Sequence, residues 1–183
     1  MNNIQLYAIS SPSGGGKTTI VKEVLRRHPI LKFSISATTR SIRNGEINGK
    51  DYFFKTKDEF KKLITDNQLI EYEELFGSYY GTLKSEIENT IRDNNKMIFD
   101  VDVNGALNIK KMYPNNSKLI FIEPANIATL QQRLRERKTE SEQGLEKRFQ
   151  RIPFELQAGK KFDKIIINNK LEEAIKEVEK EIE

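Results

Sequence analysis

The stretch Ser11-Pro12-Ser13-Gly14-Gly15-Gly16-Lys17-Thr18-Thr19 follows directly on an apolar run from Ile4 to Ile9. This order of residues predicts a strand, a glycine-rich loop and the first turn of a helix. Glycines allow backbone N–H groups to curl around phosphate oxygens, and the helix presents its positive N-terminal end to the same oxygens. The spacing follows the phosphate-binding motif G-x-x-x-x-G-K-[ST] except at Ser11, where the first glycine belongs.

The loop therefore predicts a binding site for a nucleoside triphosphate with Mg²⁺. Lys17 would reach the β- and γ-phosphates, and the Thr18 hydroxyl would ligate the metal. The residues expected to bind the triphosphate are Ser11, Pro12, Ser13, Gly14, Gly15, Gly16, Lys17, Thr18 and Thr19. A glycine-rich strand-to-helix turn without a ligand is the alternative explanation of the same residues.

The composition excludes several classes of protein and of catalytic site. The chain has 183 residues, 31 basic and 27 acidic, and its net charge of +4 is too mild and too dispersed for a nucleic-acid-binding protein. It contains no cysteine, which excludes disulfides, zinc thiolates and thiol catalysis. The single histidine, His28, precedes Pro29 at an expected helix end and is assigned a solvated or capping role. Neither a secretory signal nor a long apolar span is present, so a cytoplasmic protein without a membrane partner is expected.

Short apolar runs alternate with helical patterns along the chain. The runs predicted as strands are Ile4–Ile9, Phe33–Ile35, Met97–Val103, Lys118–Ile122 and Lys164–Ile167. Helical periodicity covers Lys17–Arg27 and the segment from Leu171 to Ile182. This alternation predicts an α/β fold, a mostly parallel sheet wrapped by helices, with ligands at the carboxyl ends of its strands.

Two segments interrupt the alternation. From Ala37 to Tyr80 the chain is polar and aromatic, which predicts an inserted lobe of short antiparallel strands with a helix near Lys57–Asp66. Thr56 and Glu59 have the spacing of a capping box for that helix. The second interruption, residues 126–157, is helical and rich in arginine, and Pro153 is expected to kink or divide its second helix.

The inserted lobe carries a second candidate site. Arg40 and Arg43, together with nearby tyrosines, form a plausible phosphate clamp, because guanidinium binds phosphate oxygens bidentately. Glu71 could accept hydrogen bonds from the N1–H and N2–H of guanine, and adenine lacks this donor pattern. Taken alone, the arginines could be ordinary surface charges, the tyrosines could be packing residues and Glu71 could be solvated.

The chain resembles guanylate kinases almost end to end. The resemblance is carried by the T-T-R-x-x-R-x-G-E run from Thr38 to Glu46, the G-K-D-Y of Gly49–Tyr52, the Y-Y-G of Tyr79–Gly81 and the phosphate loop. It implies a P-loop NTPase-like core at 1–36, 83–125 and 158–183, a mixed α/β GMP-binding insert at 37–82 and a helical lid at 126–157. The implied reaction transfers a phosphoryl group from ATP to GMP with Mg²⁺.

The resemblance also implies roles for individual residues. Those expected to bind GMP are Ser36, Arg40, Arg43, Tyr52, Glu71, Tyr80, Thr82 and Asp102. Those expected to be catalytic are Lys17, Arg40, Arg133, Arg137 and Arg148, with the last three supplied by the lid. Asn168 would contact the adenine of ATP, although Asn169 stands where the family often has Asp. A solvated, salt-bridged helix face is the alternative for the lid arginines.

The run Met97–Val103 adds two carboxylates. Strand alternation sends Asp100 and Asp102 to the same face, and such a pair is costly unless it meets a cation or hydrogen-bond donors. Asp100 is the candidate for the Mg²⁺ environment, acting through water, while Asp102 would face the guanine. The alternative is a pair of solvated aspartates at an exposed end of the strand. Asn104 replaces the Gln that the family commonly has.

Other functions stay open at this level. A non-catalytic guanylate-kinase-like binding module, a kinase for another nucleoside monophosphate, or a phosphate-loop NTPase of unrelated role would share several of these features. The use of dGMP and the oligomeric state are not determined by the sequence.

Overall fold

The protein is described here by a computed structural model that covers residues 5–75, 77–136 and 142–183. Its main sheet is built from β1 (Leu6–Ser10), β2 (Lys32–Phe33), β7 (Met97–Asp100), β8 (Ser117–Pro124) and β9 (Lys164–Asn168). The strand order is β2-β7-β1-β8-β9, and every neighbouring pair is parallel. The predicted parallel sheet is thereby confirmed.

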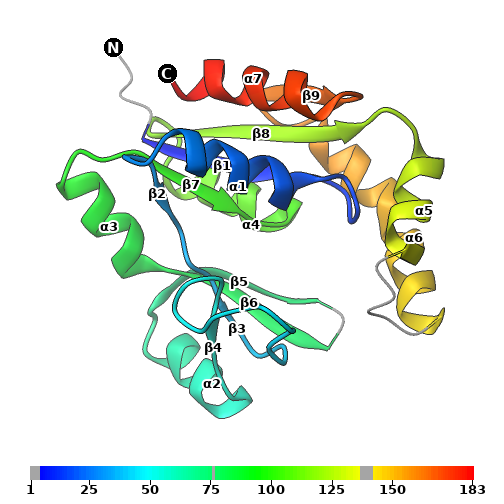
Figure 1. The fold of residues 1–183 in the computed structure, drawn as a ribbon. Coiled ribbons are helices and arrows are strands. Elements are labelled where there is room, and N and C mark those ends of the chain that lie inside the picture. The colour runs from blue at the N-terminus through cyan, green and yellow to red at the C-terminus, as the bar shows by residue number, and fades with distance from the viewer. Residues whose placement is uncertain (1–4, 76, 137–141) are drawn as a thin grey trace.

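Helices cover both faces of this sheet (Figure 1). On one face, α1 (Lys17–Arg27) and α7 (Leu171–Ile182) bury an aliphatic cluster that includes Ile20, Val178 and the strand residue Ile9. On the other face, α3 (Lys84–Arg92), α4 (Val103–Met112) and the C-terminal part of α6 (Glu142–Gly159) enclose a second cluster. Covering both faces explains why the central strands β1 and β8 are buried over almost their whole length and lack a polar side.

A second sheet forms the inserted lobe, below the main sheet in Figure 1. It contains β3 (Ala37–Thr38), β4 (Phe53–Phe54), β5 (Leu69–Leu75) and β6 (Ser78–Leu83) in the order β4-β3-β6-β5. Helix α2 (Lys57–Thr65) packs on this sheet through the fully buried Phe60. The expectation of antiparallel strands is correct for β3–β6 and β5–β6 but wrong for β3–β4, which pair in parallel.

The expected capping box is present at the start of α2. Thr56 Oγ1 accepts a hydrogen bond from the backbone N–H of Glu59, and the Glu59 carboxylate accepts one from the N–H of Thr56. The two side chains therefore satisfy backbone donors that the first turn of a helix leaves unpaired.

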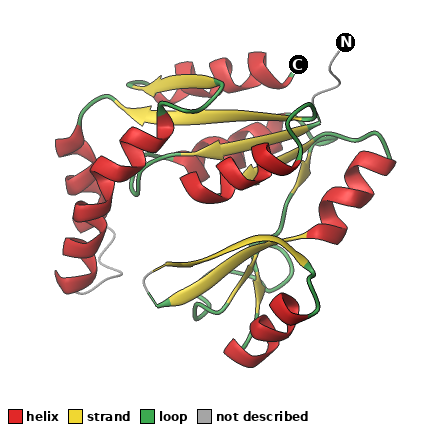
Figure 2. Cartoon of the chain, turned by 180° about the vertical axis from the view of Figure 1, so that it is seen from behind, coloured by secondary structure: helices red, strands yellow, loops and turns green. Residues whose placement is uncertain are grey.

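The arginine-rich segment forms α5 (Ile127–Glu136) and α6 (Figure 2). Seen from behind, these two helices lie side by side at the edge of the main sheet and extend toward the level of the second sheet. Of the two effects expected of Pro153, a kink or a division, the division does not occur, since α6 continues through it. Buried Ile152 and Ala158 hold the helix against its neighbours on both sides of the proline.

Strand β7 is shorter than the sequence indicates. The alternation was expected to continue to Val103, but β7 ends at Asp100 and Asp102 becomes the N-cap of α4, where its carboxylate accepts a hydrogen bond from Gly105 N at 2.9 Å. A capping interaction thus ends the strand and begins a helix. Asp100 and Asp102 consequently lie at the carboxyl end of β7 and not along a continuous strand.

The remaining differences at element ends are small. The predicted strand at Phe33–Ile35 is observed as β2 at Lys32–Phe33, and the first strand is observed from Leu6, with Ile4 outside the described residues. In the part of the chain that the structure describes, no helix combines the length and apolar character needed to span a membrane.

Candidate functional site

A cavity of about 890 Å³ lies where the glycine-rich loop, the second sheet and the β7–α4 turn meet. It brings together most of the residues singled out in the sequence. Those that line it are Ser11, Pro12, Ser13, Gly14, Gly15, Gly16, Lys17, Thr18, Ser36, Arg40, Arg43, Tyr52, Glu71, Tyr80, Asp100, Asp102 and Arg148. Residues of the two predicted sites, far apart in sequence, therefore share one cavity.

Three of the predicted residues are not among those that line the cavity, and two fall outside the described part of the structure. Thr19 lies exposed in the first turn of α1 and does not line the cavity, whereas Thr82 is fully buried behind Glu71. The side chain of Asn168 is also buried, and it donates a hydrogen bond to the backbone oxygen of Gly15 at 2.9 Å. Arg133 belongs to α5, but its side chain lies outside the described part of the structure, as does the whole of Arg137.

The glycine-rich loop leaves the start of α1 open to a ligand. Gly16 is the N-cap residue in a left-handed conformation, with φ of 91°, and no side chain caps the helix. The first backbone N–H groups of α1 are therefore available to an anion. Ser11, the departure from the motif, is accommodated because Gly15 lacks a side chain: a Cβ there would lie 2.9 Å from Ser11 Cβ and Oγ.

Lys17 and Thr18 both contact Asp100 at the end of β7. Lys17 Nζ lies 2.5 Å from Asp100 Oδ1 and donates to the backbone oxygen of Val101 at 2.8 Å. Thr18 Oγ1 donates to Asp100 Oδ2 at 2.7 Å. A hydroxyl and a carboxylate thus lie together beside the phosphate loop, and oxygen donors of this kind suit Mg²⁺. No group of three or more acidic, histidine or cysteine side chains suited to a metal occurs in the described residues.

The arginine of the second sheet is held in place before any ligand binds. Arg40 donates two hydrogen bonds to Glu46, at 2.7 and 3.0 Å, and its guanidinium lies 5.3 Å from the ring centre of Tyr52. Glu46 also accepts a hydrogen bond from the backbone N–H of Arg43 at 2.7 Å. Burial raises the pKa of the Tyr52 hydroxyl, so this group stays protonated and can donate. Tyr80 packs edge-on against Tyr52.

Glu71 lies at the inner end of the second sheet. Its Oε1 accepts a hydrogen bond from Thr82 Oγ1 at 2.7 Å. Burial raises its pKa to about 7, and the negative charges of Asp102 and Glu73 act in the same direction. Gly105 of α4 provides the space between Glu71 and Asp102, because a Cβ there would lie 3.1 Å from Glu71 Oε2 and 3.2 Å from Asp102 Oδ1.

The sequence analysis missed a charged cluster at the same end of the cavity. Arg151 Nη2 donates to Asp102 Oδ2 at 2.9 Å and to Glu73 Oε1 at 3.0 Å. Arg151 Nε lies 3.3 Å from Glu155 Oε1, and Glu155 Oε2 accepts a hydrogen bond from the backbone N–H of Ser13 in the loop. The available signal was spacing: residues 148, 151 and 155 are separated by three and four positions and share one face of a helix.

Arg148 lies next to this cluster, and its Nη1 donates to Ser13 Oγ at 3.0 Å. Helix α6 therefore contacts the phosphate loop through both Arg148 and Glu155. A cation at this position is suited to contact an anionic ligand on the loop.

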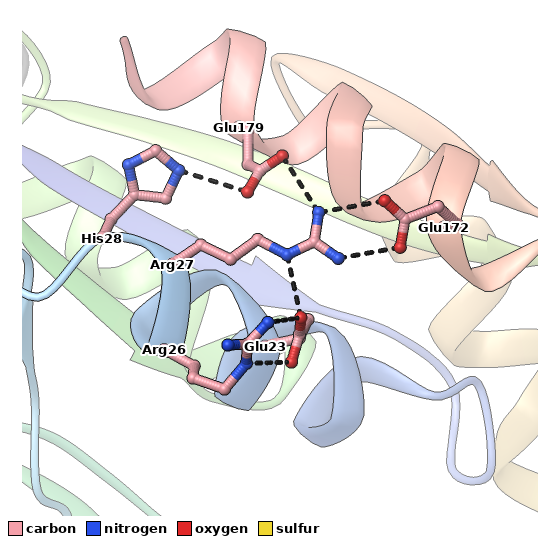
Figure 3. Close-up of polar contacts among 6 residues, drawn as sticks. All are labelled: Glu23, Arg26, Arg27, His28, Glu172 and Glu179. Atoms are coloured by element: carbon pink, nitrogen blue, oxygen red, sulfur yellow. Dashed lines mark hydrogen bonds and ion pairs between the residues drawn. The ribbon is translucent and has the colours of Figure 1, made fainter.

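His28 lies apart from the cavity, in an ion-pair network between α1 and α7 (Figure 3). It is the C-cap residue of α1, and its Nε2 lies 3.2 Å from Glu179 Oε1. Beside it, Arg27 donates to Glu23 and bidentately to Glu172. The capping position agrees with the prediction, and the network joins the loop-bearing helix α1 to the C-terminal helix.

Known proteins resemble this chain over nearly its whole length. A family model described as guanylate kinase matches residues 3–183. The guanylate kinase of Chlorobium luteolum is 41% identical over 174 residues, which covers 95% of this chain and 88% of the relative. That of Fusobacterium nucleatum is 44% identical over 169 residues, which covers 92% and 90%. The crystal structure of guanylate kinase from Anaplasma phagocytophilum matches with a TM-score of 0.80 at 27% identity and covers 98% of this chain and 85% of that one.

Proposed function

The chain belongs to the guanylate kinase family, and from this premise we propose that the cavity transfers the γ-phosphoryl group of ATP to GMP, giving ADP and GDP. The observation that carries the assignment to this cavity is its lining. Lys17 of the phosphate loop and the pair Arg40 and Glu71 of the second sheet face the same space. A kinase for a nucleoside monophosphate needs this arrangement, because its two substrates must meet in line.

The donor half of the cavity is the glycine-rich loop. Its free N–H groups and Lys17 bind the triphosphate, and Arg148 adds a positive charge from α6. Arg133 and Arg137 complete the lid in this proposal. Asn168 acts on the donor site by holding the Gly15 carbonyl, a contact made by its side chain in the structure.

The acceptor half selects GMP by its phosphate and by its base. Arg40, Arg43, Tyr52 and Tyr80 bind the phosphate, and Glu46 holds Arg40 ready for it. Glu71 accepts from guanine N1–H and N2–H, with Asp102 and Ser36 completing the contacts to the base. Thr82 orients Glu71 from behind. AMP cannot supply the same donors, so the buried carboxylate would lose its partners.

Mg²⁺ is the metal that fits the donor half. Thr18 and Asp100 would hold the ion with their neighbouring oxygens at the end of β7, Asp100 through water. The ion supplies charge neutralisation for the triphosphate oxygens. The chain itself supplies Lys17, whose ion pair with Asp100 fixes its position beside the loop.

Catalysis by these residues consists of alignment and charge stabilisation. The attacking group is a GMP phosphate oxygen that is already largely ionised at neutral pH, so no general base is needed. Lys17, Arg40 and the lid arginines stabilise the charge on the transferring group. Closure of the lobe and lid over both nucleotides excludes water and limits wasteful hydrolysis of ATP.

The first test is a set of acceptor nucleotides supplied with ATP and Mg²⁺. The proposal predicts rapid use of GMP, with AMP, CMP and UMP used poorly, and dGMP is included to measure the role of the ribose hydroxyl. Equal use of GMP and AMP would refute the assigned base recognition. Binding of GMP without turnover and without binding of ATP would instead identify a non-catalytic module.

Replacement of the loop lysine tests the donor half. Lys17→Ala should lower turnover by at least about 10²-fold, because it removes a cation aimed at the transferring group, while GMP binding measured by calorimetry stays within about twofold. Lys176→Ala, on the exposed side of α7, is the matched control and should behave as the unmodified protein. Phosphoryl transfer at the normal rate in Lys17→Ala would refute the role of the loop.

A further inference from the structure

Arg151 links three elements around the acceptor end of the cavity. It belongs to α6, in the segment assigned to the lid, yet it contacts Glu73 of β5, Asp102 at the N-cap of α4 and Glu155 of its own helix. Its side chain is 21% exposed, so this contact set is largely shielded from water. None of the assigned functions uses this arginine.

The orientation of Asp102 depends on two donors. Its Oδ1 accepts from the backbone N–H of Gly105 at 2.9 Å, and its Oδ2 accepts from Arg151 Nη2 at 2.9 Å. Because each oxygen has its own donor, the plane of the carboxylate is fixed, and its remaining acceptor directions are set relative to the cavity. Loss of Arg151 would remove the donor to Oδ2 and leave the capping bond from Gly105 N to Oδ1.

Glu73 is held by the same nitrogen. Its Oε1 accepts from Arg151 Nη2 at 3.0 Å and from Asn104 Nδ2 at 2.9 Å, whereas its Oε2 is buried and has no hydrogen-bond partner among the described residues. Glu71 precedes it by two positions on the same strand, so both carboxylates lie on one face of β5. Three carboxylates therefore meet at this end, and Arg151 is the cation that contacts two of them.

We propose that Arg151 is a positioning residue for base recognition, which orients Asp102 toward the guanine and offsets the charge of Glu73 beside Glu71. This role rests on the proposed function, since it assumes that Glu71 and Asp102 bind the base. In this role Arg151, which also lines the cavity, acts through the two carboxylates. Selection of the acceptor base thereby depends on a residue of the lid helix, and binding of GMP is coupled to the position of α6.

The test is the steady-state kinetics of Arg151→Met, which keeps an aliphatic chain but removes the charge and its hydrogen bonds. We expect KM for GMP to rise at least about tenfold, as for loss of a charge-assisted hydrogen bond, with KM for ATP within about twofold. The preference for GMP over AMP should fall by a similar factor. A merely structural role would alter both KM values and kcat together.

Two further variants sharpen the result. A single nitrogen of Arg151 serves both Asp102 and Glu73, so Arg151→Lys should recover most of the GMP affinity. If Arg151→Met does not fold, the double variant Arg151→Met with Glu73→Met removes both charges of that pair and should fold. It should still bind GMP weakly, because Asp102 has lost the donor to Oδ2. Lys147→Met, at an exposed position of the same helix, is the matched control.

Each outcome of these measurements either supports or refutes the role of Arg151. Unchanged KM for GMP in a folded Arg151→Met or in the double variant would overturn the role of Arg151, and so would tighter binding of GMP, which would show that Arg151 blocks the base site. Failure of the unmodified protein to phosphorylate GMP would instead refute the proposed function.

Discussion

Glu71 combines burial with a proposed task, recognition of guanine, that requires negative charge. Burial raises its pKa to about 7, and the hydrogen bond from Thr82 only partly offsets this effect. A carboxylate with a raised pKa stabilises the fold while it is protonated, and this contribution is lost as the pH rises through about 7. At neutral pH the ionised group therefore lowers stability until two guanine donors replace the water it has lost.

The affinity for GMP should consequently depend on pH. Below about pH 7 the protonated Glu71 cannot accept both guanine donors, so the affinity should increase as the pH rises from about 6 to about 8. Calorimetric titration of GMP at several pH values measures this change. The GMP phosphate also titrates near this range. Glu71→Gln is therefore the control, because the pH dependence of its GMP affinity retains the contribution of the phosphate and lacks that of the Glu71 carboxyl. Identical pH profiles in the two proteins would contradict the assignment.

Gly105 allows Glu71 and Asp102, the carboxylates proposed to bind the base, to approach each other. In Gly105→Ala the new Cβ would lie 3.1 Å from Glu71 Oε2, so Glu71 and Asp102 would have to shift by a few tenths of an ångström. We expect about a tenfold loss of GMP affinity with ATP affinity unchanged, while stability does not fall, because alanine is the better helix former. Titrations with both nucleotides check this, with Asn108→Ala on the exposed side of α4 as control. Normal GMP binding would show that the carboxylate positions are not critical.

Among the elements, α6 contacts the phosphate loop, strand β5 and the start of α4. Arg148 and Glu155 reach Ser13 in the phosphate loop, and Arg151 reaches β5 and α4. Its C-terminal end packs on the main sheet, where Gly159 lies so close to Phe121 that a Cβ would come within 2.4 Å of the ring. A single helix is thus connected to the donor half, the acceptor half and the core.

Helix α2 supports the acceptor lobe and depends on its N-terminal cap. Thr56→Ala removes the acceptor for Glu59 N–H and should lower the free energy of unfolding by about 1 kcal/mol. Urea denaturation followed by circular dichroism measures the loss. Thr65→Ala, in the last turn of the same helix, removes a hydroxyl that only bonds back to Lys61 and should change stability by a few tenths of a kcal/mol at most. Equal effects of the two substitutions would contradict the role of the cap.

For the molecule as a whole, the main sheet was predictable because the residue types of its strands are enough to identify them as strands. The aliphatic runs of β1 and β8 are buried on both sides, and the run of β9, in which Ile165 and Ile167 are exposed, is recognised as a strand by its β-branched residues. The end of β7 was not predictable from alternation, since the polar and apolar order continues to Val103 and only the capping bond of Asp102 marks the start of α4. Helices α3 and α4 were not predicted, and the parallel pairing of β3 with β4 depends on contacts that local patterns do not specify.

In the candidate site, too, some residues were predictable from the sequence and others were not. Lys17, Arg40 and Glu71 belong to motifs with distinctive residue types and spacing, so the sequence identified them. Arg151, Glu73 and Glu155 are ordinary charged residues whose sequence context indicates a solvated helix face or strand edge. Only the packing of α6 against β5 and α4 removes them from water and joins them to Asp102.

The central claim is that two nucleotide sites, one for ATP and one for GMP, open into a single cavity. The most direct measurement is the affinity of a dinucleotide in which adenosine and guanosine are joined through five phosphates, determined by calorimetry beside ATP and GMP alone. Joining the two ligands should tighten binding at least about 10²-fold over either one, with one dinucleotide bound per chain and both substrates displaced. A dinucleotide that binds no tighter than ATP and leaves GMP free to bind alongside it would contradict the account.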